Sequence, residues 1–229
     1  MCGMLQSRPW LINIIMLLNV TPARPSLWDL VLDGGYIMIP LALLLLVSIY
    51  IFTERCWVIT RAMREDKTFM KRIRDCIIDG DIEDAGRLCR KTDTPAARLV
   101  QKGISRIGRP MSDVLMAVEN TGNIEVSRLG KGLTWLSTTA AGAPMLGFLG
   151  TVVGMMDAFY KMSAAGKASD ITTLSGGISL ALVTTVAGLI VGIVALFAYN
   201  YLVSRLGKVM TDLESKTMEF MDMLNEPAV

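Results

Sequence analysis

Two apolar stretches decide the fold of this chain: residues 132–156 read GLTWLSTTAAGAPMLGFLGTVVGMM, and residues 171–204 read ITTLSGGISLALVTTVAGLIVGIVALFAYNYLVS. The first holds 25 residues without a charged side chain, and the second holds 34. Each exceeds the roughly 20 residues that an α-helix needs to cross the hydrocarbon core of a bilayer. We therefore expect membrane-spanning helices at residues 133–160 and 171–203, joined by a short external loop at residues 161–170.

Small and hydroxyl-bearing residues recur at helical spacing within both stretches. Lipid gives apolar helices no hydrophobic reason to associate, so small residues that let two backbones approach closely are typical of helix contacts in membranes. The residues expected at such contacts are Gly147, Gly150, Gly154, Gly177, Ala181, Gly188 and Gly192. Thr151, Thr184 and Thr185 could offer hydroxyls to a pore, or could donate only to the backbone of their own helix.

A third uncharged run, residues 34–53, predicts a first spanning helix, with Pro40 in its opening turns where a missing N–H costs least. The mean hydropathy of +0.46 beside 19% charged residues indicates a protein that is part membrane and part soluble. Residues 54–132 form a charged, helical region whose first turns are crowded with Arg and Lys, whereas Arg24 is the only basic residue close to the entrance of the first span. By the positive-inside rule, residues 54–132 and 204–229 are expected in the cytoplasm and the N-terminus outside.

Basic clusters also occur in nucleic-acid-binding proteins, but here carboxylates are interleaved throughout residues 54–132 and aromatic residues are not, so we expect no nucleic-acid partner. Asp79-Gly80-Asp81 is interpreted as a turn followed by a helix cap, because the further ligands of a calcium loop are missing. Thr94-Pro95 begins another helix. Beyond Pro110, Ser112 is expected to cap one continuous helix that runs to Phe159.

The two ends of the chain carry weaker signals. Residues 204–229 hold an apolar stripe, at Leu206, Met210, Leu213, Thr217, Phe220 and Leu224, that is expected to pack on another cytoplasmic helix or to mediate self-association. Residues 1–33 hold an 11-residue apolar run, too short to span a bilayer, that fits an interfacial segment better than a cleaved signal sequence.

The chain lacks the usual tools of catalysis. It has no histidine, its four cysteines show no metal-ligand spacing, and no phosphate-binding glycine loop follows a strand, so we expect no enzyme, no metal and no cofactor. The three apolar runs also contain no Asp, Glu, Lys or Arg. Pumps and transporters usually carry such a residue inside the membrane, so any proton carrier would have to come from a second protein.

Residues 143–156, APMLGFLGTVVGMM, resemble the second span of the MotA/TolQ/ExbB proton channel family, whose signature is Ala-Pro-x-x-Gly-x-x-Gly-Thr-Val-x-Gly. Residues 177–189 are similar to its third span, and residues 34–40 together with Glu54-Arg55 are similar to its first. The resemblance covers about residues 27 to 215. It is strongest to the ExbB/TolQ branch of the family, and within that branch it is stronger to ExbB than to TolQ.

The resemblance implies an all-α protein of the bacterial inner membrane, assembled as a homopentameric ring with cytoplasmic helices. It implies a pore lined by the second and third spans and occupied by an ExbD- or TolR-like single-span protein, whose aspartate takes up protons. Thr151 and Thr185 match the pore threonines of the family, while Leu180 stands where the family often has a glutamate. The function implied is use of the proton motive force, through the partner and a TonB-like protein, to energise outer-membrane transport.

Other readings remain open on the sequence alone. A TolQ-like stator, or another motor stator of the family, has the same three spans. A flagellar MotA-like subunit would have four spans and a larger cytoplasmic domain. A non-conducting membrane scaffold would use its small residues for packing alone.

Overall fold

The computed structural model describes residues 35–63, 68–165 and 171–225, and within these ranges all regular structure is helical. A short 3₁₀ turn, η1 (Gly35–Ile37), leads into α3 (Met38–Ala62). Four shorter helices follow: α4 (Phe69–Ile78), α5 (Ile82–Thr92), α6 (Pro95–Ile104) and α7 (Met111–Leu129). Two long helices complete the fold, α8 (Leu133–Ala165) and α9 (Ile171–Asn225).

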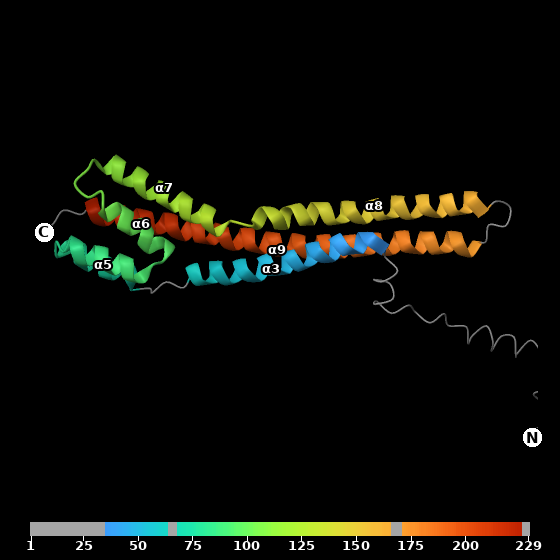
Figure 1. The fold of residues 1–229 in the computed structure, drawn as a ribbon. Helices are drawn as coiled ribbons and strands as arrows, with labels where there is room; N and C mark the ends of the chain where they lie inside the picture. The colour runs from blue at the N-terminus through green and yellow to red at the C-terminus, as the bar shows by residue number, and fades with distance from the viewer. Residues whose placement is uncertain (1–34, 64–67, 166–170, 226–229) are drawn as a thin grey trace, which may run out of the picture.

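Helix α9 is the axis of the molecule. Its 55 residues extend about 80 Å at 1.5 Å per residue. Helix α8 lies beside its first half and α7 beside its second half, while α3 packs along its middle (Figure 1). The apolar and charged regions are therefore built on one continuous element.

Three helices are long and apolar enough to cross a membrane among the described residues: Gly35–Ala62, Leu133–Ala164 and Ser175–Asn225. Many of their large side chains are exposed in the isolated chain, for example Phe148 at 66%, Leu182 at 61% and Phe197 at 72%. In water such a surface would be unfavourable, but lipid or neighbouring helices can cover it. Among the described residues of the three spans, Leu41, Ala143 and Val191 form a small hydrophobic cluster.

The main hydrophobic core lies in the charged part of the chain. Helices α4, α6 and α7 pack against the second half of α9, and α5 packs on α4 and α6. Phe69, Ile73, Leu99 and Phe220 are buried in this core. In the predicted stripe on α9, Leu213, Thr217 and Phe220 are buried against these helices, whereas Met210 is 42% exposed, so part of the stripe packs within the chain.

The predicted caps before α5 and α6 are confirmed. Asp81 accepts a hydrogen bond from the Asp84 amide at 3.1 Å, after a turn in which Gly80 has φ +75°. Thr94 accepts one from the Ala97 amide at 3.2 Å, and Pro95 occupies the first turn of α6. Each cap satisfies one of the amides left free at a helix N-terminus.

The expected single helix from Ser112 to Phe159 is wrong. Helix α7 starts at Met111 and ends at Leu129, and α8 starts only at Leu133. The expected cap is also wrong: Ser112 lies inside α7, and Pro110 stands at the N-cap without a side-chain hydrogen bond. The break falls at Gly130-Lys131-Gly132, where Gly132 adopts φ +85°. Glycine reaches that conformation without steric cost, and the carbonyl of Gly130 accepts the Leu133 amide at 3.2 Å to close the turn.

Two further expectations concern residues at the edges of the described ranges. The N-terminal segment, residues 1–33, lies outside the described residues, as do residues 166–170 of the expected loop, while its residues 161–165 belong to α8. Helix α8 itself continues to Ala165, and α9 passes without interruption from the apolar stretch into the charged one.

Candidate functional site

The second and third spans meet along a seam of small residues. The amino-terminal part of this seam on α8 is occupied by Ala143 and Gly147, which face Gly188 on α9. A Cβ added to Gly188 would lie 2.6 Å from the Ala143 carbonyl oxygen and 2.8 Å from the Gly147 Cα. Because those neighbours are backbone atoms, they cannot turn away, so the position admits glycine only.

One turn further toward the charged region, Gly192 accommodates the ring of Pro144. A Cβ at Gly192 would stand 2.7 Å from Pro144 Cγ and 3.2 Å from the Ala140 carbonyl oxygen. Pro144 is internal to α8 and cannot donate a backbone hydrogen bond. Because Gly192 has no side chain, the ring of Pro144 can occupy the space beside it.

Toward the other end of the seam, Gly154 and Ala158 face Gly177 and Ala181. The ideal Cβ of Gly154 lies 3.3 Å from that of Ala181, and a Cβ on Gly177 would collide with Ala158. Gly150 is closed off by the side chain of Thr184, which fills the position that its Cβ would need. The structure thus brings all seven of the predicted small residues into one contact between α8 and α9.

The three threonines are placed differently from one another. Thr184 is 1% exposed, sits in the seam, and donates to the Ala181 carbonyl at 2.8 Å. Thr151 is half-buried and donates to the Phe148 carbonyl of its own helix. Thr185, also half-buried, donates across the seam to the Gly147 carbonyl at 3.2 Å and within α9 to the Ala181 carbonyl at 3.3 Å. Only Thr185 joins the two helices through its hydroxyl.

The seam is free of charge. Asp157, the acidic residue nearest to it on α8, pairs with Lys161 at 2.7 Å one turn further along the same helix. Leu180 is half-buried and points to the start of the first span, where its Cδ1 lies 3.9 Å from the place of a Cβ on Gly35. The wall that α8 and α9 offer is therefore apolar, with hydroxyls as its polar groups.

Sequence reasoning missed two members of the seam, Ala143 and Ala158, which are 0% and 2% exposed. A signal for them was present. Together with Gly147, Gly150 and Gly154 they form a row of small residues spaced three or four apart, the spacing of one helix face.

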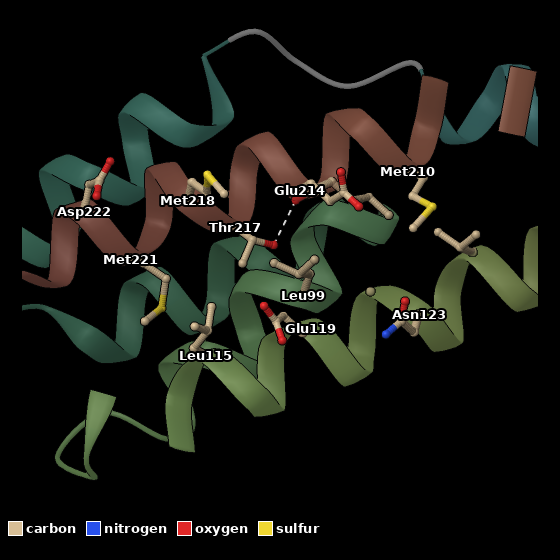
Figure 2. Close-up of a pocket in the computed structure, with 13 residues that line it drawn as sticks. Leu99, Leu115, Glu119, Asn123, Met210, Glu214, Thr217, Met218, Met221 and Asp222 are labelled. Carbon is tan, nitrogen blue, oxygen red and sulfur yellow. Dashed lines mark hydrogen bonds between the residues drawn. The ribbon is translucent and has the colours of Figure 1, made fainter. Parts of the chain in front are cut away.

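A second concave surface lies in the charged half of the molecule, between α7 and α9. Figure 2 shows this groove, of about 460 Å³, with Leu99 of α6 at its floor and the thioethers of Met210, Met218 and Met221 along α9. Carboxylates from both helices, Glu119 and Glu214 among them, stand at its edges. The hydroxyl of Thr217 donates a hydrogen bond to the Leu213 carbonyl of its own helix at 2.9 Å.

Comparison with known proteins agrees with this geometry. The sequence model of the MotA/TolQ/ExbB proton channel family matches residues 91–215, which include α8 and most of α9. The chain is 30% identical over 199 residues to a putative biopolymer transport protein ExbB-like 1 of Synechocystis sp., covering 86% of this chain and 75% of that protein. It is 30% identical over 202 residues to the biopolymer transport protein ExbB of Neisseria meningitidis, covering 82% of this chain and 89% of the relative.

A more local match strengthens the assignment. Over 77 residues, 34% of this chain, identity to the biopolymer transport protein ExbB of Xanthomonas campestris rises to 44%. With three helices able to span a membrane and an uncharged seam between the last two, the chain belongs to the MotA/TolQ/ExbB proton channel family.

Proposed function

We propose that this protein is an ExbB-like channel and stator subunit that works with an ExbD-like single-span partner and uses the proton motive force to energise TonB-dependent transport across an outer membrane. Family membership supports the channel class, and relatives named ExbB that align over most of both chains favour the ExbB branch over the TolQ branch.

The observation that carries the proposal is the lack of any Asp, Glu, Lys or Arg in the three apolar runs, residues 34–53, 132–156 and 171–204. A wall of this kind cannot carry protons by itself. It suits a partner whose aspartate is protonated on the outside, passes the apolar wall as a neutral acid, and releases its proton inside. Each proton would supply about 2.3 kcal/mol per 100 mV of membrane potential.

Within this proposal, Thr151 and Thr185 are the pore hydroxyls that hydrogen-bond water or the partner's carboxyl group. Both are half-buried in the single chain, which leaves part of each side chain accessible. Thr184 takes a packing role instead, because its side chain is enclosed between α8 and α9.

The assembly we propose is a homopentamer in a bacterial inner membrane, with the N-terminus periplasmic and residues 54–132 and 204–229 cytoplasmic. The excess of Lys and Arg after the first span supports that orientation. Exposed apolar side chains along α8 and α9 supply surface for lipid and for neighbouring subunits.

The decisive experiment replaces both pore hydroxyls, as Thr151→Val with Thr185→Val, in cells that also make the ExbD-like partner. Partner-dependent proton flux and uptake should fall roughly tenfold or more, because a hydrogen bond to a charged group contributes about 1.5–3 kcal/mol. The control is Thr151→Ser with Thr185→Ser, which keeps both hydroxyls and should keep most of the flux. If the valine variant transports normally, the protein is a scaffold rather than a channel wall.

A further inference from the structure

A basic pocket opens in the charged half of the molecule, where the carboxyl-terminal turns of α3 meet α5, α6 and α7. Its volume is about 520 Å³. We call it the α3 pocket; its lining residues are Arg55, Val58, Arg61, Ala62, Lys91, Thr92, Asp93, Thr94, Pro95, Arg98, Glu125, Arg128 and Leu129. Five of these residues are basic and two are acidic, so the pocket carries an excess of positive charge.

The two carboxylates are already engaged. Glu125, whose side chain is 5% exposed, accepts from Arg98 Nη2 at 2.7 Å and from Arg128 Nη1 at 3.1 Å. Asp93 accepts from Arg98 Nη1 at 2.6 Å. The hydrogen bond to Glu125 has the largest effect on the pKa of Arg98, and the bond to Asp93 adds to it. Both raise that pKa above its ordinary value, so Arg98 stays charged. Neither acid is left to neutralise the remaining cations.

Those remaining cations are Arg55, Arg61 and Lys91. Arg55 pairs with its sequence neighbour Glu54 at 3.0 Å, and Arg61 lies over the ring of Trp57 at 5.6 Å. Among the described residues, neither Arg61 nor Lys91 forms an ion pair. Like charges held together around one cavity repel one another, unless an anion lies between them.

Two buried donors are also without acceptors. Within the described ranges, Nε of Arg55 and Nε of Arg98 are enclosed and have no hydrogen-bond partner. A buried donor left unpaired costs free energy, and both atoms belong to residues that line the cavity. The amino terminus of α6 opens on the same cavity at Thr94 and Pro95 and adds its partial positive charge.

Arginine forks, a lysine and a helix amino terminus around one cavity form the usual environment of a phosphate group. We propose that the α3 pocket binds a phosphate group that carries a net negative charge. Arg55 stands two residues after Thr53, the last residue of the first apolar run, so an anionic phospholipid headgroup in the adjoining leaflet is one source of that group. Free phosphate is the other. A bound headgroup would tie α3 to the α5–α7 helices at the membrane surface.

The test uses the purified full-length chain and two probes. Dioleoyl phosphatidylglycerol is counted by native mass spectrometry in neutral detergent, and radiolabelled inorganic phosphate is measured by equilibrium dialysis. The pocket variant is Arg61→Gln with Lys91→Gln, since both side chains are exposed and their loss leaves the core intact. The matched control is Lys102→Gln with Arg109→Gln, which removes two exposed charges outside the pocket.

The pocket variant should bind at least one probe about tenfold more weakly than the wild type, because two charge-assisted contacts are lost, while the control binds as the wild type does. A loss confined to phosphatidylglycerol identifies the lipid as the source, and a loss confined to inorganic phosphate identifies the free anion. The proposal is overturned if the pocket and control variants bind both probes equally. Because binding is measured without proton flux, this result is independent of the channel proposal.

Discussion

The three threonines of the second and third spans make different contacts. The sequence offered Thr151, Thr184 and Thr185 as candidate pore hydroxyls, and the structure places each of them differently. Thr184 fills the space above Gly150, while Thr185 bonds across to the Gly147 carbonyl. Thr151 bonds to its own helix and keeps a side chain that is partly accessible. Two adjacent positions on a helix point about 100° apart, so only the position of the partner helix decides which of them is enclosed.

Cys89 gives a pH-dependent prediction at the same scale. Its thiol lies in the core at 1% exposure, and burial raises its pKa from 9.0 to about 11. Between those values the unfolded chain loses the thiol proton and the folded chain keeps it, so stability falls as pH rises from about 9 to 11. One such group contributes a slope of at most about 1.4 kcal/mol per pH unit.

Thermal midpoints of wild type and Cys89→Ala, measured from pH 7.5 to 10.5 in the same detergent, check this. Below pH 8 the difference between the two proteins should be constant, since both states of the wild type retain the proton. Above pH 9 the wild type should lose stability faster than the variant. Two curves that stay parallel throughout would contradict the assignment.

At the scale of elements, glycine does opposite things at two places. At Gly132 it breaks the expected long helix, because φ +85° ends α7 and lets α8 start in a new direction. At Gly147 and Gly188 it lies inside long helices and lets their backbones touch. The helical pattern of apolar residues runs through all these positions alike, which is why periodicity alone did not distinguish a break from a contact.

The seam predicts a graded response to a single added methyl group. Gly188→Ala places a Cβ against the Ala143 carbonyl and the Gly147 Cα, so α8 and α9 must separate, at a cost of about 1–3 kcal/mol. The thermal midpoint in detergent should drop. Gly176→Ala, also on α9 but with nothing within 4 Å of the new Cβ, is the control and should leave the midpoint unchanged or raised. Equal midpoints for the two variants would show that the seam is loose.

At the scale of the whole molecule, one helix couples two regions of different chemistry. The first half of α9 lines the uncharged seam, and its second half forms the spine of the charged domain through Leu213 and Phe220. The two halves are joined by one continuous helix with no loop between them. This arrangement suits a stator, which must hold its shape while a partner moves against it.

The proposed division of labour with an ExbD-like partner is testable on the whole protein. Reconstituted alone into liposomes under a 100 mV potential, the chain should conduct protons no faster than empty liposomes, because its three apolar runs hold no Asp, Glu, Lys or Arg to carry a charge. Addition of the ExbD-like partner should open a flux, measured with an enclosed pH-sensitive dye. Proton conduction by the chain without any partner would overturn the proposed mechanism.

The three long apolar helices and the helix starts at Asp81 and Thr94 were determined by the sequence alone, whereas the cap expected at Ser112 was wrong. A membrane-spanning helix can be recognised from consecutive residues alone, because a bilayer of fixed thickness requires only a long enough uncharged segment. Caps depend on residues three apart, as in Asp81 with Asp84 and Thr94 with Ala97. The family signature in residues 143–156 likewise lies within one continuous segment.

Tertiary structure alone decided which distant residues meet. Ala158 against Gly177, Thr185 on Gly147, and Arg98 paired to Glu125 across 27 positions all depend on how whole helices are placed in space. The periodicity of apolar residues predicts which face of a helix is buried, but it does not predict which other helix packs on that face. For that physical reason the small residues were foreseen as contacts, whereas the enclosed Thr184 and the basic pocket beneath α3 were not.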